Sequence, residues 1–246
     1  METIPVKPIT SWSYSRYSTY KQCPRKLKYQ AIDKIKEPKN EHLERGIRIH
    51  DGCENYIKSK SDELPEEANW IKEEIDAHRE QYKKIISGMV VEDNWSFKKD
   101  WSETHWRDWA GCWLRVKLDL AHHEDEKTLV ITDWKTGKYR PDNQDDYKEQ
   151  LQLYALAALL IHEHIEVVKP RLVYLDAQTI YPTPETTEEE ILTFRKSDIP
   201  DLKKVWEIRT KPMFNDTLFA INPSYLCRWC HYRKSNKENG GGQCEF

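Results

Sequence analysis

The chain has 246 residues, a net charge of -3, 38% hydrophobic residues and 33% charged residues. Its length favours one domain with additions over two small domains, and its composition allows a sizeable core beneath a highly polar surface. No stretch approaches the roughly 18 apolar residues that a membrane span needs. The start of the chain also lacks the basic and apolar layout of a secretory signal. We therefore expect a cytoplasmic protein with no membrane partner.

The charge balance gives no direct indication of a nucleic-acid partner, because the isoelectric point is near 6.3 rather than basic. The aromatic content points the other way. Ten tryptophans and thirteen tyrosines, many of them close to lysine or arginine, could supply stacking surfaces for single strands. The same side chains could equally pack in the core or on the surface.

The first predicted helices lie in residues 11–32, where Ser11 and Ser13 can cap a helix that breaks at Pro24. This segment is the most basic part of the chain. Its basic residues are Arg16, Lys21, Arg25, Lys26 and Lys28. They could contact phosphates, with Cys23 as a ligand of a metal cluster. Alternatively, the segment is an amphipathic helix with a solvated face and a buried free cysteine.

The next hundred residues begin with helices and change to strands. Residues 40–60 predict a helix with four residues near one face, namely Leu43, Ile47, His50 and Ile57. Residues 64–88 are typical of an acidic outer helix whose charges face solvent. From residue 90 to residue 109, aromatic residues at short intervals favour strand over helix.

Two strands joined by a polar turn follow. In residues 113–120, WLRVKLDL, apolar residues alternate with charged ones, so Asp119 lies on the polar face of a half-buried strand. Residues 128–135, TLVITDWK, are apolar on both faces until Asp133, as in a central strand that leaves the core at its end. Asp133 and Lys135 are two residues apart and project to the same side. A carboxylate and an ammonium group there, opposite a second carboxylate, predict a site for a divalent metal ion and an activated water.

The connections on either side of the second strand are polar. Residues 122–127, HHEDEK, suit a solvent-exposed hairpin turn rather than a metal site, although they include acids and histidines. The loop after the second strand carries Lys138 and Arg140, which could meet a phosphate backbone.

A helix is predicted at about 146–164, where leucine and alanine side chains form a buried face. Gln150 and Tyr154 are four residues apart and therefore share a face. Beyond this helix, residues 170–184 predict a further strand and turn, and residues 197–210 predict a second helix with an acidic start.

The order of these residues resembles the active-site core of the PD-(D/E)XK nucleases. More narrowly, it resembles their RecB-type branch, which includes the nuclease domain of the AddB helicase subunit and the CRISPR-adaptation exonucleases. The matching set is Asp119 in one strand, then Asp133, Lys135, Thr136 and Gly137 at the end of the next, then Gln150 and Tyr154 in a helix. One departure is small. The family often has Gly-Arg-x-Asp before the first carboxylate, where this chain has Arg115-Val116-Lys117-Leu118-Asp119.

The resemblance implies an α/β fold with a mixed central sheet flanked by helices. It implies a single nuclease domain over residues 1–246, with a helical insertion at 35–90. Residues 220–246, together with the region of Cys23, would form a metal-cluster subdomain.

The same resemblance implies a metal site. The ligands of Mn2+ or Mg2+ would be His50, Asp119, Asp133 and the carbonyl of Trp134. His50 lies in the pattern G-x-x-x-H, which begins at Gly46 and resembles the family helix whose histidine binds the metal. An imidazole among the ligands would favour Mn2+ over Mg2+, because Mn2+ accepts nitrogen more readily.

Further roles follow from the resemblance. Lys135 would position the attacking water and stabilise the negative charge that develops during hydrolysis. Gln150 and Tyr154 would line the site and orient that lysine or the scissile phosphate. Related nucleases often carry an additional glutamate in the first core strand, and here this would be Glu92, with Glu103 as the competitor.

Four of the six cysteines resemble the arrangement that holds a 4Fe–4S cluster in the AddB-like and CRISPR-adaptation nucleases. They are Cys23, Cys227, Cys230 and Cys244. Four thiolates bind such a cluster, which would tie both ends of the chain together. The departure is the thirteen residues between Cys230 and Cys244, where the family usually has few. Zinc held by the same thiolates, or with His231, is the alternative.

A disulfide is not expected in the cytosol. The two other cysteines, Cys53 and Cys112, are expected to be buried small hydrophobic residues.

The resemblance predicts a metal-dependent DNA exonuclease that acts on single-stranded DNA or DNA ends in recombination, repair or phage DNA processing. The cell would be bacterial or phage-infected, and a recombination or repair protein is a candidate partner. Two alternatives stay open. One is a non-catalytic DNA-end-binding or assembly module with a structural Fe–S or zinc site, and the other is an endonuclease or flap nuclease with the same site. Retention of both carboxylates and the lysine favours an enzyme.

Overall fold

A computed structural model describes residues 9–38, 40–84, 89–182 and 192–246. The chain divides into two compact units. The central unit is Asn40–Lys204, and the terminal unit combines Met1–Lys39 with Val205–Phe246. None of the described helices is both long enough and apolar enough to cross a bilayer.

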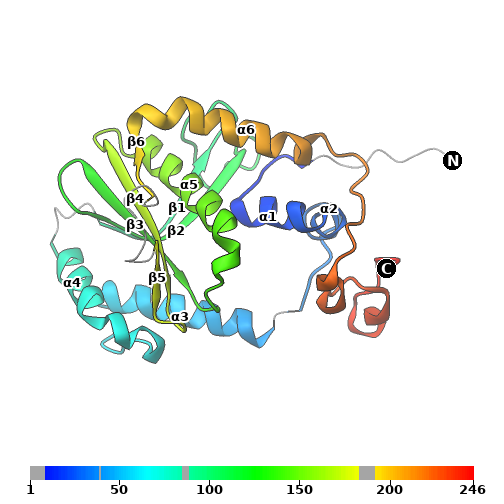
Figure 1. Ribbon diagram of the computed structural model, residues 1–246, viewed down its shortest axis with the longest axis horizontal. Coiled ribbons are helices and arrows are strands. Elements are labelled where there is room, and N and C mark those ends of the chain that lie inside the picture. Colours follow the sequence, from blue (N-terminus) through cyan, green and yellow to red (C-terminus); the bar gives the residue numbers. More distant parts are fainter. Residues whose placement is uncertain (1–8, 39, 85–88, 183–191) are drawn as a thin grey trace. The chain divides into compact units, whose positions relative to one another are not determined.

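The central unit is built on a sheet whose strands run in the order β1-β2-β3-β4-β5, with β6 paired to β4 (Figure 1). The strands are β1 (Val90–Phe97), β2 (Leu114–His123), β3 (Thr128–Lys135), β4 (Val167–Tyr174), β5 (Thr179–Tyr181) and β6 (Phe194–Arg195). Neighbours among β1, β2 and β3 are antiparallel, whereas β3 and β4 are parallel and are joined through helix α5 (Gln144–Ile161). The expected mixed α/β sheet is confirmed.

Strand β2 shows the alternation that its sequence predicts. Leu114, Val116 and Leu118 are buried, whereas Lys117 between them is exposed. Asp119 lies two residues beyond Lys117 on the same face, yet only 7% of its surface is exposed. The polar face of β2 is therefore exposed to solvent at Lys117 and buried at the carboxylate of Asp119.

The turn between β2 and β3 is shorter than the sequence predicted. His122 and His123 continue β2 and pair with Val130 and Leu129, so that only residues 124–127 connect the strands. Burial, followed by the nearby charges of His78 and Arg171, lowers the pKa of His122 to about 3. This histidine is therefore neutral and structural.

One face of the sheet is covered by α3 (Glu41–Ile57) and α4 (Lys72–Tyr82), which lie side by side (Figure 1). Helix α3 begins after Asn40, whose side chain accepts a hydrogen bond from the N–H of Leu43 at 2.8 Å. Its buried residues are Ile49, Cys53, Tyr56 and Ile57. The expectation that Leu43 and Ile47 share this buried face is wrong, because they are 53% and 44% exposed. The helix buries only its second half.

The acidic residues expected to form one outer helix form two elements instead. A 3-10 helix, η2 (Glu66–Ile71), leads directly into α4, which buries Ile75 and His78 and exposes Lys72, Glu73 and Glu80. Residues 85–88, the end of the predicted helix, lie outside the described residues.

Helix α5 covers the opposite face of the sheet, because its residue Leu151 packs with Leu172 and Tyr174 of β4. It follows the short 3-10 helix η3 (Pro141–Asn143). Its buried residues are Leu151, Leu153, Tyr154, Ala155, Leu156, Ala157, Ala158 and Leu159. After β6 come η4 (Lys196–Asp198) and α6 (Ile199–Asn215), which extends the helix expected at 197–210.

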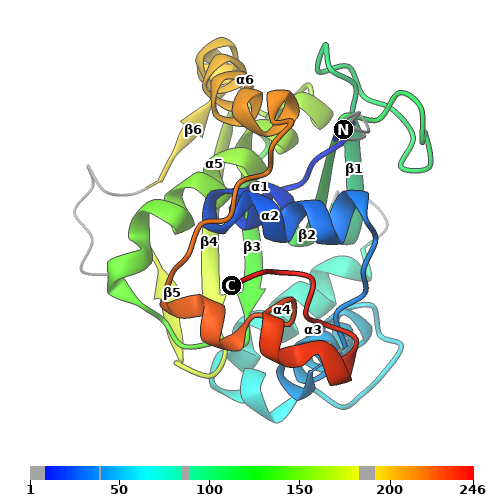
Figure 2. The same ribbon diagram turned by 90° about the vertical axis from the view of Figure 1, so that its right-hand side faces the viewer.

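The terminal unit begins with the helix break that the sequence predicted. The N-cap residue Ser13 opens α1 (Tyr14–Gln22), which ends at Cys23, and Pro24 then starts α2 (Pro24–Leu27) (Figure 2). The remaining elements are η1 (Lys28–Ile32), the end of α6, η5 (Tyr225–Trp229) and η6 (Lys234–Asn239).

Hydrogen bonds join the two ends of the chain within this unit. The hydroxyl of Tyr29 donates to the carbonyl of Gln243 at 2.7 Å, and the hydroxyl of Tyr232 donates to the carbonyl of Ile35 at 2.9 Å. The rings of Tyr29 and Tyr232 lie 5.0 Å apart. The carboxyl-terminal segment is therefore held against the segment that follows α2.

Candidate active site

Three carboxylates lie in a row across three neighbouring strands. The pairing of β1 with β2 on either side of Glu92 places this residue opposite Asp119. The ladder between β2 and β3 ends with the pair Leu120 and Thr132. Asp119 and Asp133 adjoin this pair, so they are the next residues opposite each other. Antiparallel register thus collects, at one level of the sheet, acids that are far apart in the sequence.

Strands β2 and β3 part at this level, and the parting fixes the orientation of Asp119. The last pair of the ladder is Leu120 with Thr132. Beyond it, the backbone N–H of Trp134 donates to Oδ2 of Asp119 at 2.8 Å. The carboxylate of Asp119 takes the place of a backbone partner, and its Oδ1 is left to face α3.

Helix α3 supplies an imidazole to this carboxylate. Nδ1 of His50 lies 3.3 Å from Oδ1 of Asp119. Ligand atoms of His50, Glu92 and Asp119 all lie within 4.8 Å of one another, and no other three potential ligands among the described residues do so. An imidazole and two carboxylates at this spacing suit a divalent transition metal ion.

Gly46 explains how α3 comes so close to the end of β3. A Cβ atom added at Gly46 would lie 3.2 Å from Oγ1 of Thr136, which is closer than most such contacts. His50 follows one helical turn later and therefore lies over the same part of the sheet. The glycine in G-x-x-x-H thus lets α3 approach Thr136 without crowding.

Glu92 has an unusual backbone conformation, because its φ of 48° is positive although it is not glycine. Its Oε2 lies 2.6 Å from Nζ of Lys117. Its Oε1 is buried and has no hydrogen-bond partner among the described residues. Burial, opposed by Lys117, raises the pKa of Glu92. Glu92 is therefore the glutamate at the site, and its competitor Glu103 is exposed in the loop between β1 and β2.

Asp133 makes its contacts on the α5 side of the row. Its Oδ2 lies 2.5 Å from Nζ of Lys135, and its Oδ1 accepts a hydrogen bond from Nε2 of Gln150 at 3.3 Å. Nε2 of Gln150 also donates to the hydroxyl of Tyr154 at 2.8 Å. Burial, partly offset by Lys135, raises the pKa of Asp133. Unlike His50 and Asp119, Asp133 is outside the group within 4.8 Å.

The charges and contacts of the row fit a bound cation. Among the described residues, the three carboxylates pair with two ammonium groups, those of Lys117 and Lys135, so negative charge is in excess while His50 is neutral. The unpaired Oε1 of Glu92 would otherwise be a buried acceptor without a partner, which is costly. A divalent cation would satisfy both conditions.

Comparison with known proteins decides the family. The model of the PD-(D/E)XK nuclease superfamily matches residues 11–235 of the chain. The chain belongs to the PD-(D/E)XK nuclease superfamily. The narrower likeness to the RecB-type branch and to AddB stays a prediction.

Two solved structures can be aligned with this PD-(D/E)XK protein over most of its length. One is SSO0001, with 15% sequence identity and a TM-score of 0.46, covering 92% of this chain and 85% of its own. The other, from Eubacterium rectale and described as a candidate exonuclease, has 11% identity and a TM-score of 0.44, covering 94% and 88%. No curated protein matches the sequence. The family assignment depends on the family match alone.

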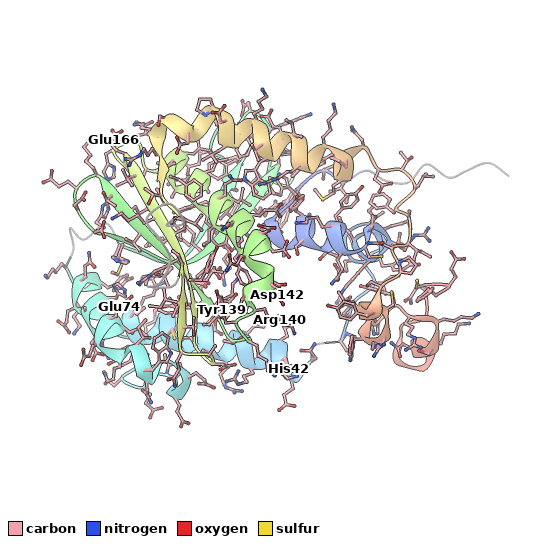
Figure 3. The ribbon with its side chains drawn as sticks, viewed as in Figure 1. His42, Glu74, Tyr139, Arg140, Asp142 and Glu166 are labelled. Atoms are coloured by element: carbon pink, nitrogen blue, oxygen red, sulfur yellow. The ribbon has the colours of Figure 1, made fainter. Side chains whose placement is uncertain are left out.

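The basic residues predicted to bind DNA in this PD-(D/E)XK protein fall into both units. Lys138 and Arg140 are exposed in the loop between β3 and α5, where Figure 3 labels Arg140 beside Tyr139 and Asp142. In the terminal unit, Nη1 of Arg16 donates to the carbonyl of Ser11 at 2.9 Å.

Two further basic residues of the terminal unit were predicted to bind DNA. Lys21 is exposed and lies 5.6 Å from the ring of Tyr17. Nε of Arg25 donates to the carbonyl of Phe219 at 2.6 Å. Arg16 and Arg25 therefore also support the fold of their own unit.

The four cysteines of the predicted cluster line one cavity of about 170 Å³ in the terminal unit. They are Cys23, Cys227, Cys230 and Cys244. Among the described residues, no three of their sulfur atoms lie within 4.8 Å of one another. Cys53 and Cys112 are buried as expected, in the central unit.

Sequence reasoning missed one residue of the site, Lys117. Its contact with Glu92 joins β2 to β1 and depends on their register. A signal was present, because Lys117 stands two residues before Asp119 and so shares its face of the strand.

Proposed function

We propose that the chain is a metal-dependent DNA exonuclease of the RecB type, which hydrolyses phosphodiester bonds in single-stranded DNA or at DNA ends. The observation that carries this proposal is the gathering of His50, Glu92 and Asp119 beside the Asp133–Lys135 pair. Membership of a nuclease superfamily supports the reaction class. The choice of DNA, and of an exonuclease, comes from the resemblance of the sequence motifs.

The side chains divide the work between them. His50, Glu92 and Asp119 would hold the cation, with Asp133 and the carbonyl of Trp134 as the further ligands expected from the sequence. When bound, a divalent ion supplies an activated water and neutralises charge on the phosphate. The imidazole ligand favours Mn2+ over Mg2+.

On the α5 side, Lys135 would position the attacking water and stabilise the charge that develops on the phosphate. Asp133 contacts Lys135, and Gln150 contacts Asp133, so each group orients the next. Gln150 is thus a positioning residue rather than one that touches the reacting atoms.

The test uses the whole protein with end-labelled single- and double-stranded DNA, in Mn2+, in Mg2+ and in EDTA. We expect metal-dependent mononucleotides or short products from linear DNA and none from closed single-stranded circles. Cutting of circles would indicate an endonuclease instead. DNA binding without any metal-dependent product would indicate the non-catalytic module.

Replacement of one lysine links the reaction to the site. Lys135→Ala should lower the cleavage rate by about 100- to 1000-fold, as when a group that stabilises transition-state charge is removed. Lys127→Ala, which alters an exposed lysine just before β3, serves as the control. Full activity in a correctly folded Lys135→Ala protein would overturn the assignment.

We also propose that Cys23, Cys227, Cys230 and Cys244 hold a 4Fe–4S cluster. Support comes from the shared cavity that they line. Zinc with bonds of about 2.3 Å would bring the sulfur atoms to about 3.8 Å from one another, which is closer than any three of them lie among the described residues. A four-iron cluster fills a larger space.

Anaerobic purification tests the cluster. We expect a brown protein with absorption near about 400 nm, as for thiolate-bound iron, and about four iron and four sulfide per chain. Cys227→Ser should lose the iron, whereas Cys53→Ser should keep it. Stoichiometric zinc without iron would favour the alternative metal, and neither metal would contradict both.

A further inference from the structure

Two tryptophans in the loop between β1 and β2, residues 98–113, lie against an arginine of β2. The guanidinium of Arg115, at the start of β2, lies 5.6 Å from the ring centre of Trp106 and 5.1 Å from that of Trp109. Trp109 is 77% exposed, and Trp106 is partly exposed. An indole this exposed has no role in the core, so it is available to contact a ligand.

The loop has a fixed shape, so its exposed indole is held in place. The carboxylate of Asp108 accepts hydrogen bonds from the N–H of Gly111 at 2.8 Å and from the hydroxyl of Thr104 at 2.7 Å. Beneath it, the buried rings of Trp101 and Trp113 meet edge to face at 5.1 Å. A preformed surface loses little conformational entropy when a ligand binds.

Strand β2 connects this surface to the carboxylate row. Arg115, Lys117 and Asp119 alternate with buried residues and therefore lie on one face of the strand. Four residues of strand span about 13 Å at about 3.3 Å per residue. Two cations thus mark a short path from the tryptophans to the site, a distance that a few nucleotides would cover.

We propose that Trp106, Trp109 and Arg115 form a base-stacking platform for single-stranded DNA, and that the strand passes from it along β2 to the carboxylates. This inference rests on the proposed nuclease function. Aromatic rings and the guanidinium plane stack on any base, so such a platform holds a strand without reading its sequence. It also supplies binding energy that the net charge of -3 does not.

The loop around the platform also offers cations to a phosphate backbone. Besides the exposed acids Asp100 and Glu103, it carries three exposed basic residues, Lys98, Lys99 and Arg107. These can contact phosphates while the rings contact bases. Of the loop's other tryptophans, Trp101 and Trp113 are buried, so they do not add to the exposed apolar surface at Trp109.

The first experiment measures the affinity of the full chain for a labelled single-stranded oligonucleotide in EDTA, where cleavage cannot occur. Trp109→Ala should weaken binding by about 5- to 150-fold, the range for loss of one stacked base. Trp109→Phe should keep most of the affinity because it keeps a ring. Arg115→Lys should weaken binding although it keeps the charge. Ile208→Ala, at another exposed apolar residue (62% exposed), is the control.

The second experiment moves a single abasic site along the oligonucleotide. At one position near the platform, loss of the base should weaken binding by the wild-type protein as much as Trp109→Ala does. The variant and the abasic strand together should cost no more than either alone, because both remove the same contact.

The outcomes separate this platform from the nuclease function. The platform is overturned if the wild-type and Trp109→Ala proteins bind the intact strand with equal affinity and the abasic strand with that same affinity, even if both proteins cut DNA. A different result would keep the platform and overturn the nuclease function. In that result, Trp109→Ala loses affinity for DNA, and the wild-type protein does not cut DNA with any metal.

Discussion

The ammonium group of Lys117 lies 2.6 Å from Oε2 of Glu92, the carboxylate whose other oxygen is buried without a hydrogen-bond partner among the described residues. The side chain of Lys117 is 59% exposed, whereas the side chain of Glu92 is 8% exposed. The ammonium group of Lys117 therefore neutralises an acid of the proposed metal site. A metal ion bound there would share the carboxylate of Glu92 with Lys117.

Lys117→Met should raise the affinity for Mn2+ by roughly tenfold, because a positive charge near the cation is removed. Calorimetric titration of the metal-free protein measures this. Lys127→Met is the matched control, since Lys127 is 60% exposed and pairs with Glu166 at 3.8 Å away from the row. An unchanged or lower affinity in Lys117→Met would show that the lysine supports, rather than opposes, the bound cation.

Gln150→Leu should lower kcat by about 10- to 100-fold, the usual effect of removing a group that orients catalytic residues. The reason is the hydrogen bond from Gln150 to Asp133, which in turn contacts Lys135. Steady-state kinetics on single-stranded DNA should show a change in kcat with little change in KM. Gln144→Leu, at the exposed first residue of α5, should behave like the wild type. A purely structural role would instead lower the melting temperature and leave kcat unchanged.

Gly46→Ala should separate stability from metal binding. Alanine favours a helix over glycine by about 1 kcal/mol, but its Cβ would lie 3.2 Å from Oγ1 of Thr136 and push α3 away from β3. We expect weaker Mn2+ binding, because His50 moves with the helix. Thr136→Ala in the same protein removes the contact, so the double variant should regain the affinity and melt at a higher temperature. If the double variant binds metal as poorly as Gly46→Ala, the packing explanation fails.

In the metal-free protein, Glu92 and Asp133 should contribute stability that is lost as the pH rises above about 4.5, the ordinary pKa of glutamic acid. Burial raises the pKa values of Glu92 and Asp133, so the folded state binds protons more tightly than the unfolded state in this range. His50 acts in the same direction at higher pH: burial lowers its pKa, but Asp119 outweighs this and the net shift is upward.

Metal binding should reverse this trend, because a cation replaces the protons. Melting temperatures measured from pH 4 to pH 8 should diverge with and without Mn2+ as the pH rises. Glu92→Gln should flatten the metal-free curve, whereas Glu103→Gln should leave it unchanged. Metal-free curves of the wild type and Glu92→Gln that run parallel across this range would contradict the raised pKa of Glu92.

The part of the site that could be predicted from sequence is the part encoded by local periodicity. Alternation along β2 predicted that Asp119 faces away from the leucines, and spacing on α5 predicted that Gln150 and Tyr154 share a face. Both patterns repeat within a few residues. They are therefore readable without knowledge of which elements are neighbours.

What could not be predicted depends on partners far away in the sequence. The family resemblance named Glu92, but its position opposite Asp119 depends on the register between β1 and β2 and on its positive φ. Neither property is encoded by the residues around Glu92. The prediction that Leu43 and Ile47 lie on the buried face of α3 was wrong for a similar reason. The sequence does not say which half of a helix contacts the sheet.

Strands β2 and β3 part beyond Leu120 and Thr132, next to Asp119 and Asp133. The place where they part depends on the exposed turn that joins them at the other end. Residues 124–127 set how far β3 is offset along β2, and an offset of one residue would send Asp133 to the other side of the sheet. Substitutions in this turn should therefore be tolerated better than insertions or deletions of one residue, which would shift the register.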